Sequence, residues 1–160
     1  MSEAVLLDTS FFIRLLSKTD KLHQNAKGYY QYFSDRDYTL KISTISIAEY
    51  CVGGERSDLP FKQVMVSPFN IDDAEQTGHF ARILFDHKEA LKKKKLPRVL
   101  IPNDAKLFAQ AHCDPDVVYY VTSDIRSGTL IKILNEHTDV DFEFIDINIP
   151  WNQQFGELFS

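Results

Sequence analysis

The sequence has few cysteines, few glycines and no long apolar run, and each shortage excludes a class of protein. Its two cysteines, Cys51 and Cys113, are too few and too far apart for a disulfide framework, and neither belongs to a CxxC zinc motif. We expect both to be small buried hydrophobic residues. The chain contains six glycines but no glycine-rich phosphate loop and no internal repeat.

No apolar stretch approaches the roughly 18 residues of a membrane-spanning helix. The first ten residues, MSEAVLLDTS, also lack the basic segment and the apolar segment of a secretory signal. We therefore expect a cytoplasmic protein with no membrane partner.

Positive charge is also scarce, since the net charge is −5. This balance argues against a protein that holds nucleic acid by bulk positive charge alone. It leaves room for a nuclease, because acids gathered around a divalent cation lower the net charge while the cation reverses the local field. The five histidines show no i,i+4 pair, so we interpret them as surface or structural residues.

The 160 residues are 44% hydrophobic and 26% charged, which is typical of one soluble globular domain. We assign this domain to residues 1–149 and a tail to residues 150–160. The tail carries four apolar side chains, Trp151, Phe155, Leu158 and Phe159. Because these would be poorly placed in water, we expect the tail to dock on its own domain or on a partner.

Short apolar runs alternate with helical patterns along the chain, which predicts an α/β fold with a parallel sheet. The clearest strand is Val117–Val121, a continuous β-branched and aromatic run typical of a strand buried on both faces. Other strands are expected at 4–7, 38–42, 64–66 and 142–147, the last at a sheet edge. Helices are expected at 11–16, 20–33, 70–95, 101–112 and 125–137, with a short helix before Gly53.

Four acids stand at strand ends or early helix positions, namely Asp8, Glu49, Asp104 and Asp124. Each has a structural interpretation as a turn residue or helix cap. For Glu49 this is specific, because Ser46 and Glu49 fit the S-x-x-E capping box. A helix that begins at Ser43 or Thr44 would instead leave Glu49 free to face the crevice.

Parallel strands would bring all four acids to one edge of the sheet. Carboxylates packed there repel one another by roughly 1 kcal/mol per pair or more unless a cation intervenes. Mg²⁺ and Mn²⁺ are hard ions that prefer carboxylate and water ligands. The sequence therefore predicts a Mg²⁺ or Mn²⁺ site suited to phosphodiester hydrolysis.

Four segments, in the family's order, resemble the signature segments of PIN-domain ribonucleases and, more narrowly, of VapC-type toxins. They are Asp8-Thr9-Ser10 after the first strand, Glu49 in a small helix after a Ser/Thr-rich segment, Asp104 opening DAKLFAQA, and Thr122-Ser123-Asp124 after a buried strand. The resemblance implies a three-layer α/β/α sandwich with a central, mainly parallel sheet. It also implies a metal-dependent endoribonuclease, acting on single-stranded or structured RNA, with an antitoxin partner and a homodimeric state.

Carried over by residue, the resemblance makes the four acids metal ligands and catalytic groups, gives Thr122 an orienting role, and gives Ser10 a lesser part beside Asp8. Ile125-Arg126-Ser127 departs from the Asp-Phe that often follows the last segment. Two alternatives remain, a non-catalytic RNA-binding or regulatory module of the same fold and a housekeeping RNA-processing nuclease without an antitoxin.

One concentrated basic segment, Lys92, Lys93, Lys94 and Lys95 with Arg98 nearby, has two interpretations. It is either an RNA phosphate-contacting patch or the solvated end of the long helix.

Overall fold

A central sheet of five strands organises the computed structural model, which describes residues 2–87 and 103–156. The strand order is β3-β2-β1-β4-β5, and every neighbouring pair is parallel. The strands are β1 (Ala4–Leu7), β2 (Thr39–Ser43), β3 (Val64–Ser67), β4 (Val117–Thr122) and β5 (Glu143–Asp146). The parallel α/β fold expected from the sequence is confirmed, with β5 at an edge.

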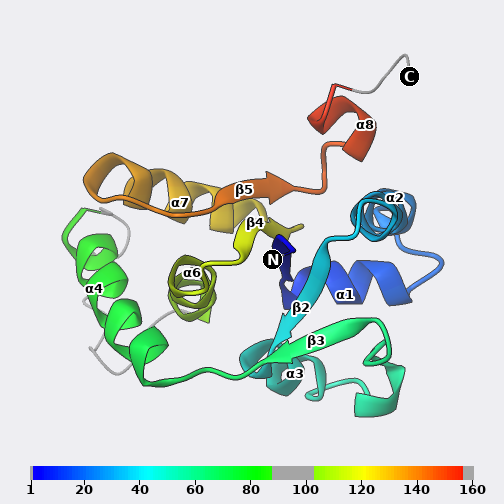
Figure 1. Ribbon diagram of the computed structural model, residues 1–160, viewed down its shortest axis with the longest axis horizontal. Coiled ribbons are helices and arrows are strands. Elements are labelled where there is room, and N and C mark those ends of the chain that lie inside the picture. Colours follow the sequence, from blue (N-terminus) through cyan, green and yellow to red (C-terminus); the bar gives the residue numbers. More distant parts are fainter. Residues whose placement is uncertain (1, 88–102, 157–160) are drawn as a thin grey trace.

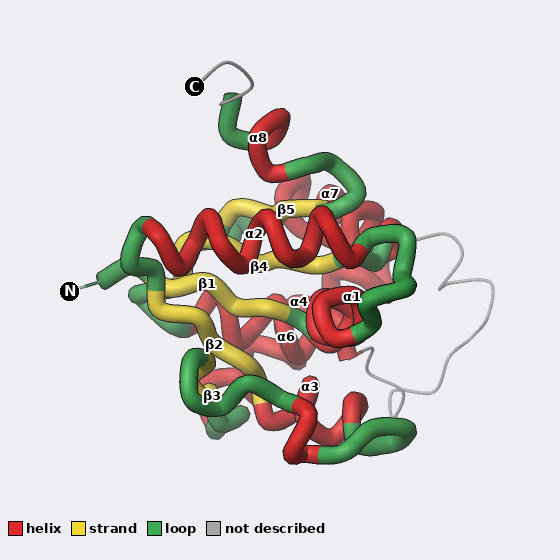
Figure 2. The backbone as a smooth tube through the Cα atoms, turned by 90° about the vertical axis from the view of Figure 1, so that its right-hand side faces the viewer, coloured by secondary structure: helices red, strands yellow, loops and turns green. Residues whose placement is uncertain are grey.

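Helices cover both faces of the sheet and complete a three-layer α/β/α sandwich (Figures 1 and 2). One face carries α1 (Thr9–Leu16) and α2 (His23–Asp35), and the other carries α4 (Ile71–His87), α6 (Asn103–Cys113) and α7 (Ile125–His137). Shorter elements are α3 (Thr44–Tyr50), the 3₁₀ turn η1 (Arg56–Asp58) and α8 (Trp151–Gln154). Within the described ranges, no helix is long and apolar enough to cross a membrane.

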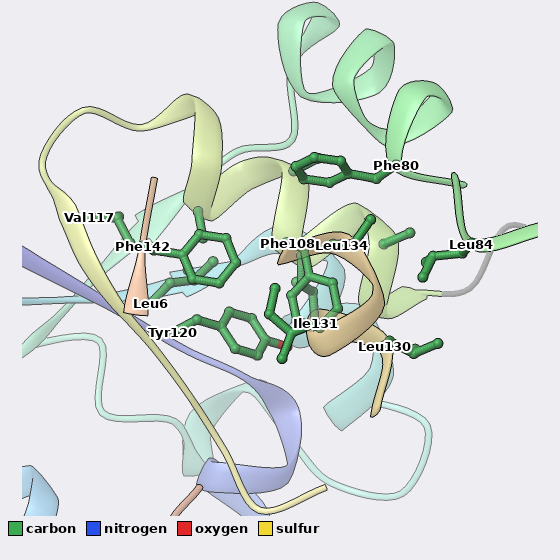
Figure 3. Packing of buried hydrophobic residues seen from close by; sticks show 14 of the residues in the cluster. Leu6, Phe80, Leu84, Phe108, Val117, Tyr120, Leu130, Ile131, Leu134 and Phe142 are labelled. Carbon is green, nitrogen blue, oxygen red and sulfur yellow. The ribbon is translucent and has the colours of Figure 1, made fainter. Parts of the chain in front are cut away.

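The core consists of two clusters, because successive side chains of a strand point to opposite faces. In β1, Val5 and Leu7 join the cluster beneath α1 and α2, whereas Ala4 and Leu6 join the cluster beneath α4, α6 and α7. Figure 3 shows this second cluster, in which the Phe108 and Tyr120 rings meet edge to face at 5.0 Å between centroids. All four side chains of β1 are buried, as expected for a central parallel strand.

The tail packs on α2 through aromatic rings. The ring of Phe155 stacks on Tyr32 with centroids 4.1 Å apart, and Trp151 lies against the same tyrosine at 5.5 Å. Gly28 makes room for this contact, since a Cβ atom there would collide with the Trp151 indole. Residues 157–160 of the tail are outside the described part of the chain.

Two expectations from the sequence change. Cys51 is exposed and Cys113 only half-buried, so the prediction that both are buried is wrong. The reason is local: α3 ends at Tyr50, and Cys51 falls in the turn beyond it. The second change concerns the basic segment, because Lys92–Lys95 and Arg98 lie outside the described residues and their two interpretations stay open.

Candidate active site

Asp8 lies where β1 ends, at the carboxyl edge of the sheet. Its backbone N–H donates to the Val121 carbonyl at 3.1 Å, which extends the pairing of β1 with β4 by one residue. Its side chain then caps α1 by accepting the Phe11 backbone N–H at 3.1 Å. The strand and the helix together fix a buried carboxylate in one position.

Hydroxyl groups surround that carboxylate. Ser10 Oγ donates to Asp8 Oδ1 and Thr122 Oγ1 donates to Asp8 Oδ2, both at 2.6 Å. The two hydroxyls lie 3.1 Å from each other, and Ser10 Oγ accepts the backbone N–H of Ser123 at 2.9 Å. This network joins the ends of β1 and β4, the strands between which the order of the sheet reverses.

Burial raises the pKa of Asp8 to about 6, from an ordinary value of 3.8. The hydrogen bonds from Ser10, Thr122 and the Phe11 N–H favour the charged form and oppose this rise, while the negative charge of Asp104 adds to it. The Asp8 carboxylate is thus well hydrogen-bonded, yet its burial makes ionisation less favourable than in water.

Glu49 reaches the same region from α3. This helix begins at Thr44, and its cap is Ser43, whose hydroxyl accepts the Ile45 backbone N–H at 3.0 Å. The capping-box interpretation is therefore wrong, and the alternative of an earlier helix start is confirmed. Glu49 Oε1 instead accepts a hydrogen bond from Thr9 Oγ1 at 2.8 Å, which ties α3 to the start of α1.

The other two acids come from helix N-termini on the opposite face. Asp104 is in the first turn of α6, and Asp124 caps α7 by accepting the Arg126 backbone N–H at 2.9 Å. Asp124 is placed by β4 as well, because its own N–H donates to Thr122 Oγ1 at 3.0 Å. The pKa of Asp104 is raised, first by burial and then by the charges of Asp124 and Glu49, while Ser127 and Arg126 lower it.

One cavity of about 190 Å³ collects these groups. All four acids line it, together with Ser10 and three residues that the sequence had not singled out: Thr9, Ile13 and Leu107. Thr122 lies behind Asp8 as part of the hydroxyl network and is fully buried. The structure thus brings together the four acids, Thr122 and Ser10.

Sequence reasoning also missed Tyr120, a buried residue of β4 whose hydroxyl lies 3.5 Å from Asp8 Oδ2. Burial holds its pKa well above the ordinary value, and the Asp8 charge adds to the effect. Tyr120 was recognised only as a strand residue, because nothing in a β-rich run shows what its hydroxyl will contact. The hydrogen bond from Thr9 to Glu49 could not be predicted from local sequence either, since 40 residues separate the two.

The donor set fits a hard divalent cation, because four carboxylates face one small cavity. A further unsatisfied group lies beside it: Ser127 Oγ is fully buried without a hydrogen-bond partner at bonding distance, and it faces Asp104. No three His, Cys, Asp or Glu side chains within 2–87 and 103–156 are arranged to enclose an ion as they stand. The four carboxylates are thus suitable ligands in chemical type, but their side chains would have to move closer together to coordinate an ion.

Solved structures share this architecture. A chain of the crystal structure of VapBC2 from Rickettsia felis bound to a DNA fragment from their promoter matches 89% of this chain over 99% of its own length, at 18% identity and a TM-score of 0.58. This protein has a VapC-type PIN-domain fold. The PIN-domain resemblance drawn from four short segments is confirmed at the level of the fold.

Two other solved structures share this fold. A chain of DNA-bound VapBC from Salmonella typhimurium covers 91% of this chain and 98% of its own, at 17% identity and a TM-score of 0.58. VapC20 of Mycobacterium tuberculosis, a sarcin-ricin loop cleaving toxin, covers 79% and 94% at 18% identity and a TM-score of 0.52. No protein-family model matches the sequence, and no curated protein matches it significantly.

Proposed function

We propose that this protein is a metal-dependent endoribonuclease acting on single-stranded or structured RNA. The observation that supports this proposal is the cavity lined by Asp8, Glu49, Asp104 and Asp124, which come from four separate segments of the chain. Four acids at one sheet edge make a poor binding surface for an RNA phosphate unless a cation joins them. One solved structure of the same fold is of a sarcin-ricin loop cleaving toxin, which favours the same activity.

Asp8, Glu49, Asp104 and Asp124 would hold Mg²⁺ or Mn²⁺. Such an ion lowers the pKa of bound water and neutralises charge on the phosphate oxygens. Hydroxyl groups of the protein orient these carboxylates, since Ser10 and Thr122 donate to Asp8 and Thr9 donates to Glu49. Hydrogen bonds of this kind keep carboxylate ligands in position.

The surroundings of Asp104 favour a cation beside it. Burial and the neighbouring charges of Asp124 and Glu49 raise its pKa, so a divalent cation among these carboxylates would relieve their mutual repulsion. The buried Ser127 hydroxyl faces this carboxylate and has a hydrogen-bond position to spare.

The toxin role is part of the same proposal. Two of the similar structures are VapBC complexes bound to DNA. Ile13 and Ile125 line the cavities at this edge and are exposed, which gives an antitoxin segment apolar contacts beside the acids. We propose an antitoxin partner on this basis, and a homodimer because the resemblance to VapC-type toxins implies one.

Cleavage of a labelled single-stranded RNA by the purified protein tests the activity. We expect cleavage with Mn²⁺ and none in excess chelator. Glu49→Gln should not cleave the RNA. The matched control is Glu136→Gln, which makes the same charge change on the exposed side of α7 and should cleave normally. Cleavage in chelator, or equal cleavage by Glu49→Gln, contradicts the metal-dependent nuclease. RNA binding without cleavage in Mn²⁺ favours a non-catalytic binding module.

The adjacent reading frame tests the toxin role. A small neighbouring gene for a DNA-binding protein that suppresses growth inhibition by this chain supports a toxin–antitoxin pair. A solitary gene that is harmless when overexpressed favours a housekeeping RNA-processing nuclease.

A further inference from the structure

A second cavity, of about 410 Å³, opens beside the acid cavity. The two share Ser10, Ile13 and Asp124 as a common wall. Their charges differ, because the second cavity adds two arginines, Arg14 from α1 and Arg126 from α7. A strongly acidic site and a paired cationic site therefore adjoin at the carboxyl edge of the sheet.

Arg14 is held in place before any ligand binds. Its Nη1 donates to Asp20 Oδ2 at 2.8 Å, and its Nε donates to Ser123 Oγ at 3.4 Å. The side chain is 29% exposed, and its Nη2 has no partner among the described residues. Because the guanidinium is planar, fixing two of its nitrogens also fixes the direction in which the third donates.

Arg126 is by contrast 88% exposed and paired loosely, with its Nε 3.4 Å from Asp124 Oδ1. Its positive charge also reaches Asp104, whose pKa it lowers. An exposed pair of this length contributes little to stability. The arginine can therefore turn to an incoming anion at small cost.

We propose, on the basis of the ribonuclease function above, that Arg14 and Arg126 form a binding subsite for an RNA backbone phosphate adjacent to the phosphate that is cut. Guanidinium groups match phosphate oxygens geometrically, and two of them lining one cavity can both donate to a single anion. The shared wall makes this subsite adjacent to the acids. A chain with a net charge of −5 needs such a local attraction to hold RNA.

Binding of a fluorescein-labelled single-stranded RNA, followed by fluorescence anisotropy in Ca²⁺, a hard cation that carboxylates also bind, tests the subsite separately from cleavage by the Mn²⁺ form. We expect Arg126→Gln to weaken binding about tenfold, the loss expected for one charge-assisted hydrogen bond. The slope of log affinity against log salt should fall by about 0.7, as for one lost phosphate contact on a single strand. Arg82→Gln, which removes an exposed arginine of α4, is the matched control and should change neither value.

Arg14→Gln should weaken binding similarly, but it also breaks the contact with Asp20 and lowers stability, so Arg126→Gln decides the question. An RNA with uncharged methylphosphonate linkages gives the complementary test, since wild type and Arg126→Gln should bind it equally. Equal affinity and equal salt slope of Arg126→Gln and Arg82→Gln for ordinary RNA overturn the subsite.

The two proposals fail separately. If the protein binds RNA through Arg126 but does not cut it with Mn²⁺, the subsite stands and the nuclease does not. If it cuts RNA with Mn²⁺ and Arg126→Gln has unchanged affinity and KM, the nuclease stands and the subsite does not.

Discussion

The substitution Asp8→Asn should stop RNA cleavage while making the metal-free protein more stable at neutral pH. Asp8 is almost fully buried, and burial raises its pKa from 3.8 to about 6. A rise of this size means that ionised Asp8 costs the native state roughly 3 kcal/mol above pH 6. Asparagine has a similar shape but no charge, so this cost disappears.

Lost hydrogen bonds offset part of the gain. The Phe11 backbone N–H needs an oxygen at the Oδ1 position, so the amide nitrogen takes the place of Oδ2 and the Thr122 hydroxyl must rotate to accept rather than donate. With about 1 kcal/mol subtracted for that change, we expect a net gain of roughly 2 kcal/mol. The melting temperature should then rise by several degrees, at about 2–4 °C per kcal/mol for a chain of this size.

The direction in which stability changes with pH distinguishes removal of the buried Asp8 charge from a general effect of the substitution. A carboxyl whose folded pKa lies above its unfolded pKa stabilises the native state at low pH, and stability falls as the pH rises from about 4 to 6. The advantage of Asp8→Asn should thus be present at pH 7.5 and absent near pH 4.

Thermal melts in chelator at both pH values, with Asp86→Asn on the surface of α4 as control, measure the effect. In Mn²⁺, cleavage by Asp8→Asn should fall by more than about 100-fold, the upper end of what loss of a hydrogen-bond partner behind a metal ligand costs. A melting temperature lowered equally at both pH values would refute the claim that desolvation dominates at Asp8.

Three further results are expected. Thr122→Val removes the donor to Asp8 and the acceptor for the Asp124 N–H, so the kcat of RNA cleavage should fall about 10–100-fold. Thr122→Ser keeps the hydroxyl and should retain most activity. Equal loss of kcat in both variants contradicts a role of the hydroxyl. Millimolar Mn²⁺ should raise the melting temperature, by the equivalent of about 2.7 kcal/mol at 100 times its Kd, and an unchanged melt counts against the cation site. Gly28→Ala should displace Trp151 from α2 and quench or shift the fluorescence of that single tryptophan, an effect that Gly53→Ala, in open space, should not reproduce.

The parallel sheet and two of the acid positions were predictable from local pattern. Asp8 and Asp124 each follow a buried apolar run and precede a helix, and both patterns are contained within about a dozen consecutive residues. Parallel strands align their carboxyl ends, so the meeting of these acids at one edge followed from strand direction alone.

The position of Glu49 could not be predicted from local pattern. Ser43 and Ser46 were both acceptable caps by sequence, and the choice between them depended on contacts from elsewhere in the chain. Ser43 donates to Gln110 of α6, and Thr9 of α1 bonds the Glu49 carboxylate. Both contacts span 40 residues or more, and each requires the sheet and its crossing helices to be in place.

The chemical roles of the site residues were also predictable only in part. The order of residues was enough to predict that acids and hydroxyls stand at the sheet edge. The donation from Thr122 to Asp8 and the cavity that Arg14 shares with Arg126 emerge only when the chain is folded. The reason is that hydrogen-bond partners and pKa values depend on distances between elements, which the order of residues along one chain does not contain.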